Sequence, residues 1–150
     1  MVGDGPLRRE CERFANENRA PVRFAGFLNQ TQIVSAYVAS DALVLPSDGG
    51  ETWGLVVNEA MSCGLPCIVS DRVGCGPDLV TSGETGFVFP LGDVERLSKL
   101  MTQCAGDAPA LAHMGVCARH RVARYSPSVA VEGVLRAVEA VKANAGGHGA

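Results

Sequence analysis

Short apolar segments alternate with helical segments along this chain of 150 residues, and this alternation constrains the fold more than any other feature. Residues 42–46 (ALVLP), 67–70 (CIVS) and 86–90 (GFVFP) are almost continuously apolar and are short for helices. Strands of this kind are typical of a parallel sheet whose two faces are both covered by helices. The sequence therefore predicts an α/β fold with a doubly wound parallel sheet.

The segments around these strands supply the remaining elements. Residues 22–26 (VRFAG) are expected to form a further strand, and Met1-Val2 the end of another, because a Gly-Asp-Gly-Pro turn follows at once. Apolar spacing and capping residues predict helices over 7–20, 29–40, 54–63, 93–104, 108–125 and 128–142. In a doubly wound sheet, ligands bind beyond the carboxyl ends of the strands. The loops expected at those ends are 3–6, 26–30, 47–54 and 71–76.

Charge, composition and cysteine spacing exclude several classes of protein. A formal net charge of −3 and an aromatic content of 5% argue against nucleic-acid binding, which needs clustered basic side chains and stacking platforms. No apolar run reaches the length of a bilayer span and the N-terminus lacks the order of a signal peptide, so we expect a cytoplasmic protein. The six cysteines form no CxxC pair and no zinc set, and they are expected to be reduced thiols.

The loop at residues 47–54 (SDGGETWG) carries the main functional signal. It opens directly onto a predicted helix, whose first N–H groups and positive dipole end can bind a phosphate or diphosphate. Gly54 lets the backbone come close to such a ligand. From spacing alone, an ordinary strand-to-helix turn explains the loop slightly better. Taken singly, Glu51 is explained as a loop carboxylate and Glu59 as a solvated helix residue.

Taken together, these residues form a longer pattern. Glu51 and Glu59 are separated by seven residues, an E-x7-E arrangement inside the run ETWGLVVNEAMSCGLP at residues 51–66. Three further segments occur in the matching order, namely VGDGP at 2–6, VGCGPD at 73–78 and GETGF at 83–87. Over nearly the whole chain, this arrangement resembles the signature of retaining glycosyltransferases of the GT-B fold, family 4 type, also called group 1 glycosyl transferases.

The resemblance implies a role for each matching residue. Glu59 would hold the ribose of a nucleotide-diphosphate sugar, and Glu51, the catalytic candidate, would face the donor sugar. The N–H groups expected to take the diphosphate are those of Gly54, Leu55 and Val56. The residues expected beside the nucleotide are Gly3, Gly5, Gly26 and Phe27. Such enzymes transfer a sugar to an acceptor with retention at the anomeric carbon, so we expect no cofactor and no metal, the nucleotide sugar being the donor substrate.

Two features depart from the family pattern. Trp53 stands where a smaller residue or Phe is usual, so its ring would narrow the site or cover the base. The chain also begins late, because the basic pair that precedes the Gly-Asp-Gly turn and the acceptor-binding N-terminal domain are not in this sequence. Arg8 and Arg9 are expected to be solvated helix residues rather than replacements for that pair.

The implied domain organisation follows from this late start. Residues 1–143 are expected to form one nucleotide-sugar-binding, Rossmann-like domain, the C-terminal half of a GT-B fold, and residues 144–150 a disordered tail. The sugar or lipid-linked acceptor would bind the missing domain, so the chain alone is expected to be inactive. Peripheral membrane association of the full-length protein stays open.

Two other functions stay open at this point. One is a non-catalytic nucleotide-binding module, and the other is a nucleotide-sugar epimerase of the same fold. Turnover with the donor alone would favour the epimerase, and binding without turnover in an extended chain would favour the module. The leading interpretation is the glycosyltransferase, a carbohydrate-biosynthesis enzyme, because the E-x7-E run is embedded in its strand–loop–helix context.

Overall fold

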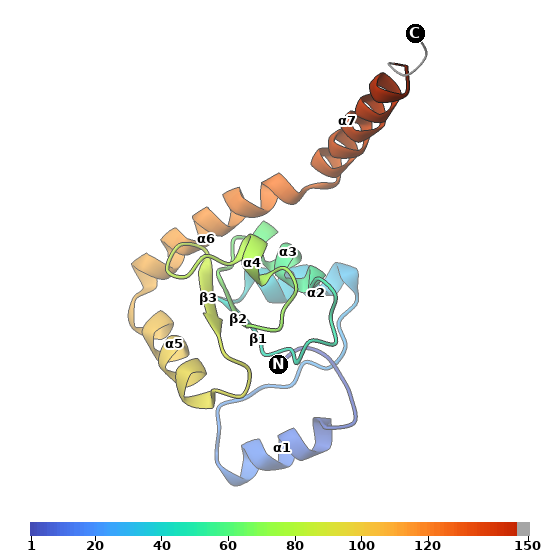
Figure 1. Cartoon of the computed structure of the whole chain (residues 1–150). Helices are drawn as coiled ribbons and strands as arrows, with labels where there is room; N and C mark the ends of the chain where they lie inside the picture. The colour runs from blue at the N-terminus through green and yellow to red at the C-terminus, as the bar shows by residue number, and fades with distance from the viewer. Residues whose placement is uncertain (147–150) are drawn as a thin grey trace. The chain divides into compact units, whose positions relative to one another are not determined.

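The three apolar segments form a parallel sheet, as predicted. In the computed structural model, which describes residues 1–146, the strands are β1 (Leu43–Leu45), β2 (Cys67–Ser70) and β3 (Gly86–Phe89), in the order β1-β2-β3 (Figure 1). The register aligns Val44 with Ile68 and Ile68 with Phe87, so these three side chains share one face. The chain divides into two units, Met1–Ala39 and Ser40–Ala150, and the sheet belongs to the second.

Helices cover both faces of this sheet. On one face, α5 (Val94–Gly106) and α6 (Ala108–Val122) pack over the aligned side chains. The buried core there contains Ile68, Phe87, Phe89, Leu100, Cys104, Leu111 and Met114. Val69 points to the opposite face, where it lies beside the start of α4 (Gly76–Leu79), and α3 (Leu55–Ser62) contacts β2. The fold is therefore the doubly wound α/β arrangement that the sequence predicts.

Glycines allow two close backbone approaches in this unit. A side chain at Gly86 would overlap the carbonyl oxygen of Cys67 on the neighbouring strand. A side chain at Gly115 in α6 would overlap the carbonyl oxygen of Gly64, which follows α3. Arg119, one turn further along α6, donates to the Cys63 carbonyl over 3.2 Å. These contacts fix α6 against the end of α3.

The first unit contains α1 (Arg8–Glu17) and α2 (Gln30–Val38). For α2, where Asn29 and Thr31 are both possible capping residues in the sequence, the cap is Asn29, in a capping box with Gln32. The strand expected at residues 22–26 is wrong, because its pairing with residues 1–3 amounts to one isolated parallel bridge, from Val2 to Gly26, and a few backbone hydrogen bonds beside it. Val22 donates instead to the nearby Ala20 carbonyl, so this end of the segment turns locally and forms no ladder.

The C-terminal part of the chain continues in helices. A short 3₁₀ helix, η1 (Ala123–Tyr125), follows α6, and α7 (Pro127–Gly146) begins after Ser126. Of the tail expected at residues 144–150, the backbone of 144–146 belongs to α7 and residues 147–150 lie outside the described residues. Over the described part of the chain, no helix is both long and apolar enough to cross a membrane.

Candidate functional site

The loops that follow β1 and β2 meet at the carboxyl end of the sheet. The Ser70 hydroxyl donates to the carbonyl of Ser47, and the Cys75 N–H donates to the Trp53 carbonyl over 2.8 Å. A side chain at Gly74 would overlap the Thr52 carbonyl oxygen. The second loop is therefore backed directly against the first, and the close approach needs glycine at residue 74.

Gly54 forms the junction between the first loop and α3. It is buried and has φ +97° and ψ +58°, a left-handed conformation that favours glycine. A Cβ placed on it would lie 3.0 Å from Val73 Cγ1 and 3.2 Å from Glu51 Oε2. Leu55 and Val56 follow as the first residues of α3, where backbone N–H groups have no acceptor within the helix. This junction therefore presents N–H donors and a positive dipole end beside a carboxylate.

Glu51 carries an unusual buried oxygen. Within residues 1–143, whose side chains are described, its Oε2 is the one buried side-chain nitrogen or oxygen that has no hydrogen-bond partner. Buried polar atoms are almost always paired, because leaving one unpaired costs about 1–3 kcal/mol. This unpaired acceptor makes Glu51 a candidate for binding a ligand.

Glu59 lies on the exposed side of α3. Val57, Ala60 and Met61 form the buried side of the helix, with no measurable exposure. The E-x7-E spacing thus places one carboxylate just before the helix start and the other in its second turn. The two glutamates differ in environment, since Glu51 is partly buried and Glu59 is exposed.

The Trp53 ring makes contacts that the sequence did not predict. Its indole N–H donates to Asn58 Oδ1 over 2.8 Å, and its ring lies 6.1 Å from the Tyr125 ring, centroid to centroid, at an interplanar angle of 39°. The Tyr125 hydroxyl in turn lies 3.4 Å from both the carbonyl oxygen and Oδ1 of Asp78. Tyr125 belongs to η1, far from the loop in sequence, and nothing in its local pattern indicated this contact.

Two buried thiols belong to the second loop and to the strand before it, namely Cys75 in the loop and Cys67 at the start of β2. Burial, with a smaller contribution from the nearby Glu51 and Asp78 carboxylates, raises the pKa of Cys75 to about 11. Burial also raises the pKa of Cys67 to about 12. Both are neutral thiols at pH 7, and the Cys75 Sγ lies 3.7 Å from the Gly54 carbonyl oxygen. All six cysteines are free, as predicted, and these two are packing groups rather than nucleophiles.

The other predicted nucleotide contacts lie in the first unit. The Gly3 N–H donates to the Gly26 carbonyl over 2.8 Å, so the Gly-Asp-Gly turn and the segment before α2 are joined. Phe27, next to this junction, is 77% exposed. The structure therefore brings Gly3 together with Gly26, and Glu51 together with the start of α3, each group within its own unit.

Arg8 is more constrained than a solvated helix residue. Its Nη1 lies 2.9 Å from Asp4 Oδ2, and its Nε lies 2.8 Å from Glu12 Oε1. The hydrogen bonds to Glu12 and Asp4 raise the pKa of this guanidinium further above its ordinary value. A Cβ on Gly26 would lie 3.1 Å from Arg8 Nη1, so this cation sits at the glycine turn.

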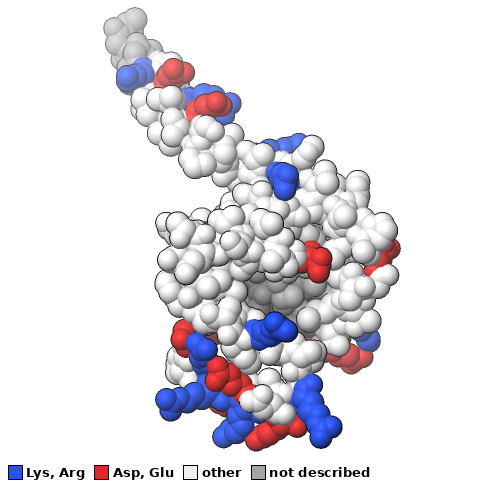
Figure 2. Space-filling model, turned by 180° about the vertical axis from the view of Figure 1, so that it is seen from behind, with Lys and Arg blue, Asp and Glu red and all other residues white. Residues whose placement is uncertain are grey.

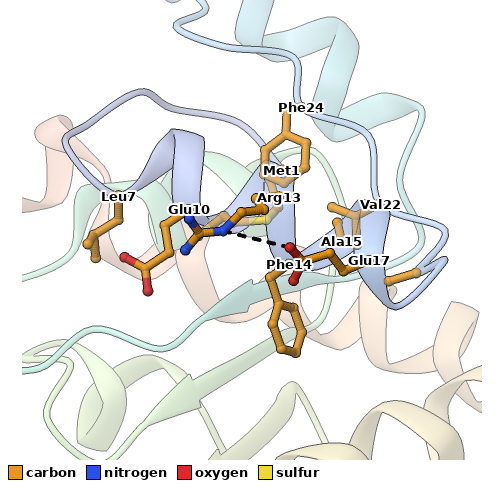
Figure 3. Close-up of a pocket in the computed structure, with 11 residues that line it drawn as sticks. Met1, Leu7, Glu10, Arg13, Phe14, Ala15, Glu17, Val22 and Phe24 are labelled. Atoms are coloured by element: carbon orange, nitrogen blue, oxygen red, sulfur yellow. Dashed lines mark ion pairs between the residues drawn. The ribbon is translucent and has the colours of Figure 1, made fainter.

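Two hollows open on the first unit. The one drawn in Figure 3 has a volume of about 420 Å³ and is lined mainly by apolar side chains of α1 and of residues 20–24, including Phe14, Val22 and Phe24. The other, of about 410 Å³, is lined by the glycine turn, with Gly3, Gly5 and Arg8 on its wall. Only the second contains residues that the sequence assigned to nucleotide binding.

Charged side chains are spread unevenly over the face seen in Figure 2. Figure 2 shows Lys, Arg, Asp and Glu gathered over α1, and further charged side chains along α7, on the face in view. Within the described residues, no group of three or more His, Cys, Asp and Glu side chains is placed to hold a metal ion. Arg72, which follows β2, is an exposed cation near the site loops, and its Nε lies 3.7 Å from Asp71 Oδ1.

Comparison with known proteins identifies relatives of this chain. Residues 1–121 match the family described as Glycosyl transferases group 1. The chain is 37% identical to sulfoquinovosyl transferase SQD2 of Arabidopsis thaliana over 83% of its length and 24% of that protein. It is 34% identical to N-acetyl-alpha-D-glucosaminyl L-malate synthase of Bacillus anthracis, over 81% of the chain and 32% of that protein. The chain thus spans about a quarter to a third of these relatives.

Solved structures give the same result for the fold. The chain superimposes on HepE of Anabaena, solved in complex with UDP, with a TM-score of 0.77 and 26% sequence identity. The match covers 93% of this chain and 40% of that protein. Both units therefore lie within the segment that the two proteins share.

Proposed function

This chain belongs to the glycosyl transferases group 1 family, and on that premise we propose that it binds the nucleotide-diphosphate sugar from which a glycosyltransferase transfers the sugar to an acceptor with retention of configuration. The observation that carries the proposal is the unpaired Glu51 Oε2, buried beside the left-handed Gly54 at the start of α3. A carboxylate acceptor and a set of N–H donors, side by side, suit a ligand that carries both hydroxyl and phosphate groups.

Each part of the donor has a group of complementary chemistry. The N–H groups of Leu55 and Val56 and the dipole of α3 would stabilise the negative charge of the diphosphate, which grows as the sugar leaves. Glu59, exposed on the same helix, would accept hydrogen bonds from two ribose hydroxyls. Glu51 would accept from a hydroxyl of the donor sugar. The related HepE was solved with UDP, which supports a nucleoside diphosphate as the ligand here.

No resident cofactor is needed for this assignment. Hydrogen-bond donors fixed in place and a helix dipole can carry the charge of the leaving diphosphate without a divalent ion. We propose that donor binding by this chain is independent of metal. Adding a chelator in excess should leave the affinity for a nucleoside diphosphate unchanged, and loss of binding would show that a metal ion bridges the diphosphate.

A titration can distinguish the roles proposed for Glu51 and Glu59. UDP-glucose, UDP-N-acetylglucosamine and GDP-mannose are each titrated by calorimetry, alongside UDP or GDP, into the wild type, Glu59→Ala and Glu51→Ala. Glu59→Ala should weaken binding of the nucleoside diphosphate and of the nucleotide sugar alike, by about 1–3 kcal/mol, since both ligands carry the ribose. Glu51→Ala should weaken only the nucleotide sugar.

Two results would contradict the assignment. If Glu59→Ala binds the diphosphate as tightly as the wild type, Glu59 does not hold the ribose. If the wild type binds none of these compounds at millimolar concentration, this chain is not a donor-binding unit by itself. The control is the stability of each variant in urea. Both variants should remain folded, because neither Glu51 nor Glu59 belongs to the buried core.

A further inference from the structure

Trp53 lies between the two groups that the proposed function depends on. Glu51 precedes it by two residues and Gly54 follows it directly. The loop has little regular structure of its own between β1 and α3, so the position of Glu51 must be set by contacts with other segments. Trp53 makes such contacts in three directions.

The main chain of Trp53 is tied to the loop after β2. The Cys75 N–H donates to its carbonyl over 2.8 Å, and a Cβ on Gly74 would come within 3.2 Å of its Cα. The indole N–H is tied to α3 through Asn58 Oδ1 at 2.8 Å. The ring lies against Tyr125 of η1, whose hydroxyl reaches Asp78 of α4. One side chain therefore joins the first loop to α3 and to η1, while its backbone joins it to the second loop.

We propose that Trp53 is a positioning residue for Glu51. Trp53 holds the Glu51 carboxylate at the start of α3 and so sets how much more tightly the nucleotide sugar binds than the bare nucleoside diphosphate. The inference rests on the proposed function, since it assigns the sugar to Glu51. It differs from a direct role of the indole, because the ring is engaged with Tyr125 and its N–H with Asn58.

The geometry explains why the effect should fall on Glu51. Its Oε2 is buried without a partner, so the loop has no hydrogen bond from that oxygen to keep it in place. A loop freed from its anchor would let the carboxylate turn to water, where it recovers hydration. The N–H groups at the start of α3 would stay where they are, because the helix is fixed by Val57, Ala60 and Met61 in the core.

The preference for the nucleotide sugar is the quantity that tests the inference. It is the ratio of the dissociation constant of the nucleoside diphosphate to that of its nucleotide sugar, for the tightest-binding pair among the compounds titrated above. Trp53→Phe keeps an aromatic ring and removes the indole donor. It should lower the ratio by roughly threefold to tenfold, the scale of one lost hydrogen bond, and change the affinity for the diphosphate by less than about twofold.

A double variant shows whether Trp53 acts through Glu51. If it does, Trp53→Phe combined with Glu51→Ala should have the same ratio as Glu51→Ala alone. Tyr125→Leu, which removes a ring outside the loop, should lower the ratio as Trp53→Phe does. Tyr125→Phe is its matched control and should leave the ratio near the wild-type value, because the ring contact remains and the hydroxyl contacts at 3.4 Å are long.

Trp53 is the only tryptophan in the chain, which gives a readout that needs no ligand. Its fluorescence emission should shift to longer wavelength in Tyr125→Leu, as the ring gains water, and stay unchanged in Tyr125→Phe. An equal loss of affinity for the diphosphate and the nucleotide sugar in Trp53→Phe would overturn the positioning role. So would a double variant in which the effects of Trp53→Phe and Glu51→Ala on the ratio multiply. A wild type that binds no diphosphate would contradict the proposed function, and the inference with it, whereas a normal ratio in Trp53→Phe would contradict the inference alone.

Discussion

Gly54→Ala tests whether the junction between the first loop and α3 needs glycine for both conformation and space. An alanine at φ +97° has to adopt a left-handed conformation, which costs about 1–2 kcal/mol in a residue other than glycine. Part of this is recovered because alanine reduces the entropy of the unfolded chain, by about 0.4–1 kcal/mol. The conformational effect alone is therefore a destabilisation on the order of 1 kcal/mol.

The steric part depends on which neighbour can move. The new Cβ would lie 3.2 Å from Glu51 Oε2, and that carboxylate can swing away. It would also lie 3.0 Å from Val73 Cγ1, and Val73 is 2% exposed and stiff at its branched Cβ. Overpacking of this kind costs about 1–3 kcal/mol. The total expected loss for Gly54→Ala is about 2–4 kcal/mol.

Gly92→Ala is the matched control for this substitution. Gly92 has a similar left-handed φ of +85°, but a Cβ there would meet nothing within 4 Å. Urea unfolding at constant slope should show Gly54→Ala less stable than Gly92→Ala by at least about 1 kcal/mol. Gly54→Ala should also lose the preference for a nucleotide sugar, since Glu51 is displaced. Equal stability of the two variants would refute the argument that close packing at Gly54 constrains the site.

Two further predictions concern the buried thiols and the share of its relatives that the chain spans. Because folding raises the pKa of Cys75 to about 11 and that of Cys67 to about 12, their contribution to stability is complete below the unfolded value of 9.0 and is lost as the pH rises through the folded values. Urea unfolding should therefore show stability falling from about pH 9 upward, by up to about 1.4 kcal/mol per pH unit for each thiol. The fall with pH should be shallower in Cys75→Ala. An identical slope in that variant would contradict the burial of the Cys75 thiol. Positioning the acceptor lowers the activation barrier by up to about 7–11 kcal/mol in well-oriented reactions. The chain alone, incubated with nucleotide sugars and pooled sugar acceptors, should therefore show no sugar transfer. Clear turnover would show that these residues suffice for transfer.

The sequence predicted the elements whose signals are local. The three strands are apolar over consecutive residues, and α2 begins at a capping residue with its partner three positions later, so both could be placed without knowledge of the fold. The position of Glu51 and Glu59 around one helix start follows from the same local rule, because the 3.6-residue repeat fixes where Glu59 lies on α3.

What the sequence missed depends on neighbours that are distant along the chain. Residues 22–26 have a strand-like pattern, yet they pair with residues 1–3 alone among the described segments, through one bridge and a few hydrogen bonds, and a strand needs a partner along its length. The contact between Trp53 and Tyr125 depends on how α6 ends beside the loop, which Gly115 and Arg119 determine by tertiary packing. The burial of the Glu51 oxygen likewise depends on how the loop folds back beside Gly54, and no periodicity in the sequence indicates that.

We propose above all that the start of α3 binds the diphosphate of the donor. The most direct measurement is a titration of ¹⁵N-labelled chain with UDP, and in parallel with GDP, followed by amide resonances. The backbone N–H signals of Gly54, Leu55 and Val56 should shift together and saturably, with those of α5 unchanged. Saturable binding that leaves these three amides unmoved while shifting signals elsewhere would contradict the account.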